Sequence, residues 1–235
     1  MEAANIEGTR RLLAAAAGRV GRWVQASTVA VYGQPRAGVI TETSPLAQMH
    51  VYARTKARAD ELVAKLASGG GFEHVILRTC AMIGPGMPGR FLYRIIALLD
   101  RGLFAPVGPP GALISLLPVV NAAHALRECG RLPQAAGETF ILADQCSVER
   151  LVALLCEGLG RRPPRWRLPE APLRFAIRLA ERFPPGKLTL GQLEVLTSRT
   201  LYSSEKIRHT LGYRPIVGLD EILRQLASDW REGKS

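Results

Sequence analysis

The chain has 235 residues, of which 47% are hydrophobic and 22% charged, and its formal net charge at pH 7 is +11. This composition is that of an ordinary globular protein, long enough for one large domain or two small ones, and no run reaches the ~18 apolar residues of a membrane span. The basic excess is mostly arginine spread along the chain, without nucleic-acid-binding motifs, so we expect a solvated basic surface that also suits phosphate-bearing ligands.

The first predicted elements are a helix and a buried strand. The helical pattern begins at Asn5, and residues 23–31 form an apolar, β-branched run before Gly33, as is typical of a strand in a parallel sheet. Thr28 is expected at the carboxyl end of this strand. A Ser-Pro pair at 44–45 then breaks the chain before the next element.

The next predicted helix, residues 51–66, carries a candidate catalytic pair. Tyr52 and Lys56 are four residues apart and therefore share one face of the helix. An ordinary tyrosine, with a pKa of about 10, is a poor base at neutral pH, but a nearby ammonium group and the positive end of the helix dipole favour a phenolate. If Thr28 hydrogen-bonds the same substrate oxygen, the three side chains can move a proton on and off an alcohol.

A Tyr-x-x-x-Lys pair alone is more often an exposed pair on a helix surface, and the surrounding segments favour the catalytic interpretation. They read Ala-Ser-Thr-Val-Ala-Val-Tyr-Gly at 26–33, Thr-Glu-Thr-Ser-Pro at 41–45 and Tyr-Ala-Arg-Thr-Lys at 52–56. In this order they resemble the extended short-chain dehydrogenase/reductases, and more narrowly the NAD-dependent epimerase/dehydratase branch that acts on nucleotide sugars. The resemblance extends along the whole chain.

The resemblance implies an α/β fold with two parts. Residues 1–145 are expected to form the carboxyl-terminal half of a Rossmann-like NAD(P)-binding domain, a partial doubly wound parallel sheet, with residues 85–111 contributing to the substrate side. Residues 146–235 are expected to form a smaller, mostly helical substrate-binding lobe. NAD is the implied cofactor, with NADP left open, and the implied reaction is that of a UDP-glucose 4-epimerase-like oxidoreductase using the Thr/Tyr/Lys triad.

The family also has a glycine-rich turn that holds the cofactor pyrophosphate, and we find no such turn in the expected context. Residues 5–9, Asn-Ile-Glu-Gly-Thr, resemble the start of the family's fourth helix, and the loops at 84–86 and 108–111 are stiffened by proline. We therefore expect a truncated chain that is inactive by itself. A shortened reading frame, a partner chain that supplies the missing half, and a non-catalytic relic or binding module stay open as explanations.

The next strand, residues 74–78, leads into a turn that resembles the family's segment beside the nicotinamide ring. Thr79 and Cys80 are candidate cofactor contacts there, although a role as a small buried side chain explains Cys80 equally well, and no neighbouring base makes it a nucleophile. Arg90, before a predicted helix at 91–99, is a candidate contact for a substrate phosphate.

The remaining predicted elements alternate as in an α/β domain and then become helical. They are an apolar run at 113–120, a helix at 122–128, a strand at 139–142, a helix capped by Ser147 that extends through residue 159, and helices at 173–183, 190–196 and 219–230. The helix at 173–183 interleaves arginines with apolar residues, and we favour its packing within the lobe over contact with a membrane surface.

Four positions depart from the family pattern. Ile114, Pro118 and Val120 stand where the family has, respectively, an arginine for the nucleotide diphosphate, an aromatic residue or histidine, and an acid. These differences leave a non-sugar alcohol or ketone as the alternative substrate. Val29 follows Thr28 in place of the acid that assists a dehydratase, which favours an epimerase or a simple reductase.

The four cysteines are scattered without metal-ligand spacing, so no metal site is expected. Cys80 and Cys156 lie in apolar runs, which predicts buried, reduced thiols in a cytoplasmic protein. For assembly, a homodimer and a partner chain that completes the cofactor site both stay open.

Overall fold

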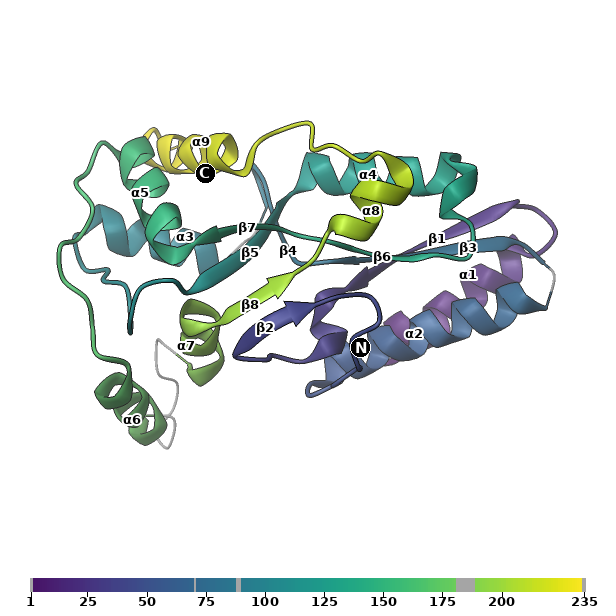
Figure 1. The fold of residues 1–235 in the computed structure, drawn as a ribbon, viewed down its shortest axis with the longest axis horizontal. Helices are drawn as coiled ribbons and strands as arrows, with labels where there is room; N and C mark the ends of the chain where they lie inside the picture. The colour runs from purple at the N-terminus through teal and green to yellow at the C-terminus, as the bar shows by residue number, and fades with distance from the viewer. Residues whose placement is uncertain (1, 70, 88–89, 181–188, 234–235) are drawn as a thin grey trace.

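The structure is a computed structural model that describes residues 2–69, 71–87, 90–180 and 189–233. Figure 1 shows an elongated molecule in which strands run along the long axis between layers of helices. In chain order the elements are α1 (Gly8–Ala16), β1 (Arg22–Thr28), β2 (Ala37–Ile40), α2 (Val51–Ser68), β3 (Glu73–Thr79), β4 (Ala81–Ile83), α3 (Arg90–Asp100), β5 (Leu113–Pro118), α4 (Val119–Arg131), β6 (Thr139–Leu142), β7 (Asp144–Ser147), α5 (Val148–Leu159), α6 (Glu170–Ala180), α7 (Leu190–Thr197), β8 (Arg199–Tyr202), α8 (Glu205–Leu211) and α9 (Leu219–Arg231).

A parallel sheet with the strand order β1–β3–β6 forms one end of the molecule. Figure 1 shows α1 and α2 along one side of these strands and α4 along the other. Thr28 pairs with Thr79, which in turn pairs with Leu142, so the carboxyl ends of the three strands are in register. The helices cover both faces because the strands bury nearly continuous apolar runs, such as Val75 to Leu77 of β3.

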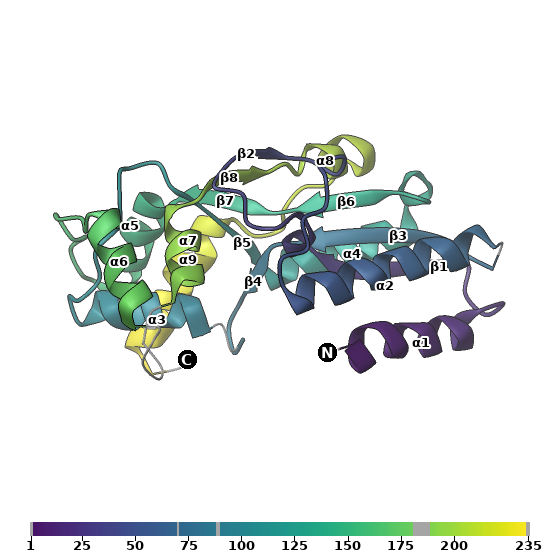
Figure 2. The same cartoon turned by 90° about the horizontal axis from the view of Figure 1, so that it is seen from below.

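A second three-stranded sheet, ordered β4–β5–β7, lies toward the other end and carries a separate core. β4 and β5 are parallel, whereas β5 and β7 are antiparallel. Its apolar face packs with α3, α5 and α9, whose buried side chains include Ile96, Leu155 and Leu223. Figure 2 shows these three helices grouped at the end opposite to α1 and α2.

The strands β2 and β8 form a small parallel pair whose members lie far apart in the sequence. Ala37 pairs with Arg199, and Ile40 pairs with Tyr202. This pair joins the segment that follows the Thr28 strand to the carboxyl-terminal helical region. Neither strand was predicted, because a run of four residues carries little period-2 signal of its own.

Most predicted elements are confirmed. The helix at 51–66 is α2, the strand at 74–78 is β3, and the strand at 139–142 is β6. Ser147 caps α5 as predicted, because its Oγ accepts a hydrogen bond from the Arg150 amide at 3.0 Å. The helix predicted at 173–183 is α6, and residues 181–183 lie outside the described residues.

The predicted strand at 23–31 is wrong at its end. β1 stops at Thr28, and Val29–Tyr32 form a short 3₁₀ helix. The Thr28 hydroxyl accepts a hydrogen bond from the Ala30 amide at 3.2 Å, which caps this helix and turns the chain. The turn continues through Gly33, whose φ of 78° suits glycine.

The predicted burial of Cys80 and Cys156 is confirmed. All four cysteines are free, and Cys80 and Cys156 are buried. Among the described helices, none has the combination of length and apolar character that crossing a membrane requires.

Asn121 is a fully buried amide that ties α4 to the segment before α9. Its Oδ1 accepts hydrogen bonds from the amides of Ile216 and Val217, and its Nδ2 donates to the Val217 carbonyl at 2.8 Å. We expect Asn121→Ala to lower the free energy of unfolding by about 3 kcal/mol, because it removes three hydrogen bonds between a buried amide and the backbone, each worth about 1 kcal/mol. Chemical denaturation measures the loss, and Gln225→Ala, at an exposed position of α9, is the control that should change little.

Candidate functional site

A cavity of about 710 Å³ opens at the carboxyl ends of β1 and β3. Its first wall comes from the end of β1, the first two turns of α2, and the turn after β3. Its second wall comes from β5, α7 and β8, and the cavity therefore lies where the parallel sheet meets the carboxyl-terminal region. The lining includes Ala26, Ser27, Thr28, Tyr52, Lys56, Thr79, Cys80, Met82, Met87, Ile114, Ser115, Glu170, Glu194, Ser198 and Tyr202.

The structure brings together five of the six residues that the sequence singled out. Thr28, Tyr52, Lys56, Thr79 and Cys80 all line this cavity. Arg90 begins α3, but its side chain lies outside the described part of the structure. The roles assigned to these residues stay predictions.

Tyr52 and Lys56 occupy the first two turns of α2 on the face toward the cavity. The Tyr52 side chain is 45% exposed and so stays accessible from the cavity. Lys56 is more enclosed, and its Nζ donates a hydrogen bond to the Ala26 carbonyl of β1. Burial lowers the pKa of Lys56, and the Asp60 carboxylate opposes this shift.

Thr28 faces the same cavity from the end of β1. Its Oγ1 accepts the Ala30 amide hydrogen, which leaves its own hydroxyl hydrogen free to be donated to another oxygen. Thr79 pairs with Thr28 in the sheet, and its Oγ1 donates to the Ser27 carbonyl at 3.3 Å. The strand pairing therefore places two threonine side chains beside the α2 pair.

Cys80 lines the cavity but lacks the surroundings of a nucleophile. Its side chain is buried, and this burial, together with the charge of Asp144, raises the pKa of the Cys80 thiol far above its ordinary value. The structure therefore agrees with the sequence interpretation that Cys80 is a small buried residue at the edge of the site.

Sequence reasoning missed a buried polar cluster directly behind the α2 pair. Asp60, one helical turn after Lys56, accepts a hydrogen bond from the Ser27 hydroxyl at 2.8 Å and forms an ion pair with Arg78 at 3.4 Å. Arg78 also donates to the Tyr32 hydroxyl at 2.7 Å. The available signal was the spacing Tyr52, Lys56, Asp60, which continues along one helix face.

Glu42, in the Thr-Glu-Thr-Ser-Pro segment at 41–45, makes a contact that stabilises the fold. Its Oε1 accepts a hydrogen bond from the Ile141 amide of β6 at 2.8 Å. This contact ties the loop between β2 and α2 to the edge of the parallel sheet and satisfies a backbone donor there.

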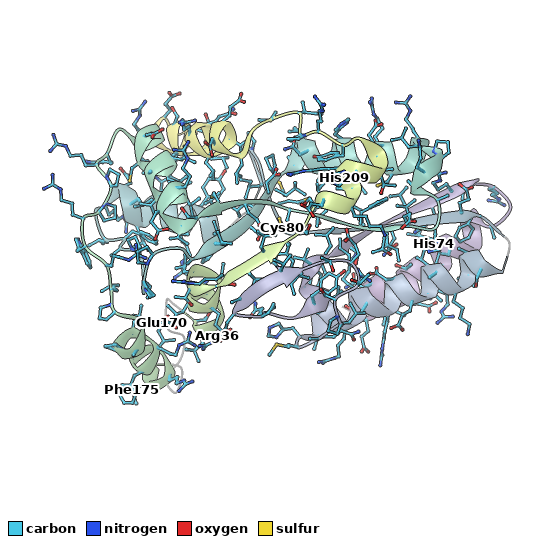
Figure 3. All side chains as sticks on the ribbon, in the orientation of Figure 1. Arg36, His74, Cys80, Glu170, Phe175 and His209 are labelled. Carbon is cyan, nitrogen blue, oxygen red and sulfur yellow. The ribbon has the colours of Figure 1, made fainter. Side chains whose placement is uncertain are left out.

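The wall opposite the α2 pair combines apolar side chains with two carboxylates. Glu170 of α6 and Glu194 of α7 both line the cavity, and Arg174 bridges them at 2.7 Å and 3.6 Å. Arg36 also lines the cavity, and Figure 3 labels it, like Glu170, toward the α6–α7 region of the molecule. Ile114 and Ser115 line the cavity where the sequence analysis noted the lack of an arginine.

The predicted loop Gly84-Pro85-Gly86 is a loop in the structure, and it connects the strand β4 to the helix α3. It belongs to the second sheet, whereas Thr28 and Thr79 end strands of the first. Residues 88–89 of the loop lie outside the described residues.

Comparison with known proteins adds three findings. A family model described as the NAD dependent epimerase/dehydratase family matches residues 1–118. The chain is 35% identical to a dTDP-glucose 4,6-dehydratase from an Actinoplanes species, over 99% of this chain and 68% of that protein. It is 25% identical to isoform 2 of a 3beta-hydroxysteroid-dehydrogenase/decarboxylase from Arabidopsis thaliana, over 94% of this chain and 43% of that protein.

The fold is also shared with solved structures. UDP-glucuronic acid 4-epimerase from Bacillus cereus, solved in complex with NAD, has a TM-score of 0.72 and 18% identity over 97% of this chain and 68% of that one. The likeness confirms the predicted α/β class with a Rossmann-like parallel sheet. The chain spans about half or less of several curated relatives, namely 36%, 43% and 52% of their lengths.

Proposed function

Since the chain belongs to the NAD-dependent epimerase/dehydratase family, we propose that it serves NAD-dependent oxidation and reduction at a secondary alcohol of a nucleotide sugar, in the manner of a UDP-glucose 4-epimerase. The observation that carries the proposal is the convergence of Thr28, Tyr52 and Lys56 on one cavity at the carboxyl ends of β1 and β3. Ligands of open α/β sheets bind at this edge.

The residues present fit one end of the proposed cofactor. The Lys56 ammonium and the hydroxyls of Thr28, Tyr52 and Thr79 surround the cavity and suit the nicotinamide riboside portion, with Thr79 and Cys80 as backbone contacts beside the ring. When bound, NAD supplies a hydride acceptor. We assign no described residue to the pyrophosphate or the adenosine, and NADP stays open.

The chain's own residues would handle the proton. Tyr52 takes the proton of the substrate hydroxyl at its phenolic oxygen, and Thr28 donates a hydrogen bond to the same substrate oxygen and orients it. The Lys56 ammonium stabilises the negative charge on the Tyr52 oxygen. Val29, the residue after Thr28, has no proton to give, which favours an epimerase or a reductase over a dehydratase.

A second candidate substrate is an uncharged, non-sugar alcohol or ketone. Its support is the cavity lining, which includes the apolar side chains of Met82, Met87 and Ile114 and two glutamates that would repel a diphosphate. The steroid-dehydrogenase relative acts, by its name, on such an alcohol. Arg36, which lines the cavity, and Arg90, proposed from the sequence alone, would favour the sugar nucleotide instead.

The proposed organisation follows the family. Residues 1–145 would hold the cofactor, with residues 85–111 contributing to the substrate side, and residues 146–235 would form the substrate lobe. We further propose a cytoplasmic location and either a homodimer or a second chain that completes the cofactor site.

A substrate panel tests the proposal. A version of the protein extended upstream of Met1 is incubated with NAD or NADP and with UDP-glucose, UDP-galactose, dTDP-glucose, or a cyclic secondary alcohol such as a sterol. We expect a change at a sugar carbon of a nucleotide sugar, followed by proton NMR of the sugar and by absorbance of the reduced cofactor. If the sterol reduces NAD and the nucleotide sugars do not react, the result would favour the second substrate class. If none of these substrates reacts, the result would favour a relic or binding module.

A further inference from the structure

Asp60 lies behind the candidate site, in a position that none of the predicted roles explains. It is 3% exposed, and its Oδ2 accepts the Ser27 hydroxyl and faces Arg78, while its Oδ1 has no hydrogen-bond partner in the described part of the chain. A buried carboxylate oxygen without a partner is costly, and such groups persist where their charge serves a purpose.

The same two elements that hold Asp60 also hold Lys56. Lys56 donates to the Ala26 carbonyl, and Asp60 accepts from the next residue, Ser27, so consecutive positions of β1 anchor consecutive turns of α2. The following residue of β1 is Thr28. Figure 2 shows α2 lying along the strands, and α2 packs against β1 and β3. The three candidate catalytic side chains therefore lie on α2 and β1, the two elements that these hydrogen bonds hold together.

We propose that Asp60 is a positioning residue for this site: its buried carboxylate, anchored on Ser27, keeps Lys56 charged and directed at the end of β1. This inference rests on the proposed function, because it assigns Asp60 a part in preparing Lys56 for Tyr52. A half-buried ammonium loses stabilisation from water, and a carboxylate one turn away on the same helix face replaces part of it.

Three neighbours of Asp60 favour its ionised form. Burial raises the pKa of Asp60 above its ordinary value, and the Ser27 hydrogen bond, Arg78 and Lys56 oppose this shift. From β3, Arg78 faces Asp60 directly, and from the 3₁₀ turn Tyr32 faces Arg78. Burial raises the pKa of Tyr32, which keeps that hydroxyl neutral. Glu42 lies beyond Tyr32, whose hydroxyl is 3.5 Å from the Glu42 carbonyl.

The test measures the ionisation of Lys56 directly, without cofactor or turnover. The chain has five lysines, so trace acetylation with acetic anhydride across a pH series, read by mass spectrometry of peptides, resolves each amine. Asp60→Asn keeps the shape and removes the charge, and we expect Lys56 to be acetylated about threefold faster at pH 8, because more of it is neutral. Lys65, exposed on the same helix, is the internal control and should not change.

Two further variants separate charge from packing. Ser27→Ala removes the hydrogen bond but keeps the Asp60 charge, and Asp60→Glu keeps the charge, so both should leave the Lys56 profile close to that of the parent. If Asp60→Asn does not fold, the paired change Asp60→Asn with Arg78→Met removes the charges together and should still speed Lys56 labelling. An unchanged Lys56 profile in the folded charge-free variants, or an equal change in Asp60→Glu, would overturn the proposal.

Where the protein turns over, the alkaline limb of its pH–rate profile should move to lower pH in Asp60→Asn, because Lys56 loses its proton sooner. A shifted Lys56 profile in an upstream-extended version that shows no turnover would support the positioning role and count against the proposed function. The two ideas therefore fail separately.

Discussion

Tyr52→Phe is expected to reduce turnover by about 10²- to 10⁴-fold, the usual contribution of a positioned acid–base group. The change removes only the phenolic oxygen that would take the substrate proton, and it leaves Lys56 and its contact with the Ala26 carbonyl in place. NAD affinity should therefore change little, so the loss should appear in kcat. The measurement is steady-state kinetics in a form of the protein that oxidises its substrate, either these 235 residues or a version extended upstream.

The cavity supplies a matched control for this variant. Tyr202 of β8 lines the same space from the opposite wall and also carries a phenolic hydroxyl. Tyr202→Phe should retain most of the activity, because no part of the proposed proton transfer uses it. A Tyr52→Phe enzyme with a near-normal rate, or equal losses in both variants, would refute the assignment of Tyr52.

The second large effect concerns the cofactor. We expect the 235 residues alone to bind NAD with a Kd that is millimolar or weaker, because most of the free energy for holding a dinucleotide comes from its pyrophosphate at a glycine-rich helix start and from its adenosine pocket. The candidate contacts here, Thr28, Tyr52, Lys56, Thr79 and Cys80, surround only one cavity and suit only the nicotinamide end.

Calorimetric titration with NAD and NADP, beside a version extended upstream, checks this expectation. Micromolar binding by the 235 residues alone would contradict it and would direct attention to the loop between β4 and α3. In that case Gly86→Val, at a residue with a φ of 70°, should abolish the binding by distorting that loop. If the expectation is right, the same variant should not affect the cofactor affinity of the extended version.

The network behind the site affects how such variants are interpreted. Because Lys56 and Asp60 dock on consecutive residues of β1, a change at either position alters both the charge near Tyr52 and the seating of α2. The turnover of a neutral Lys56 variant should therefore be compared with that of Lys56→Arg, which keeps a cation at this position. The comparison separates lost charge from lost attachment.

The sequence by itself predicted the elements whose signals are local. The helix with Tyr52 and Lys56 follows from apolar spacing and a glycine stop, and the α5 cap follows from Ser147, because helical hydrogen bonds join residues only four apart. β3 and β6 follow from short apolar runs between breakers. The ordered segments around Thr28 and Tyr52 were sufficient to indicate the family that the comparisons show.

Only the tertiary structure decided the contacts between distant parts of the chain. β1 ends at Thr28, where the hydroxyl caps the 3₁₀ helix that follows. The pairing of Ala37 with Arg199 depends on where two distant segments meet. Glu170 and Glu194 reach the cavity because α6 and α7 pack beside it. Asp60 looks like an ordinary helix carboxylate until the sheet buries it against Ser27 and Arg78. Burial and charge pairing are properties of this packing, and no local period of the sequence encodes them.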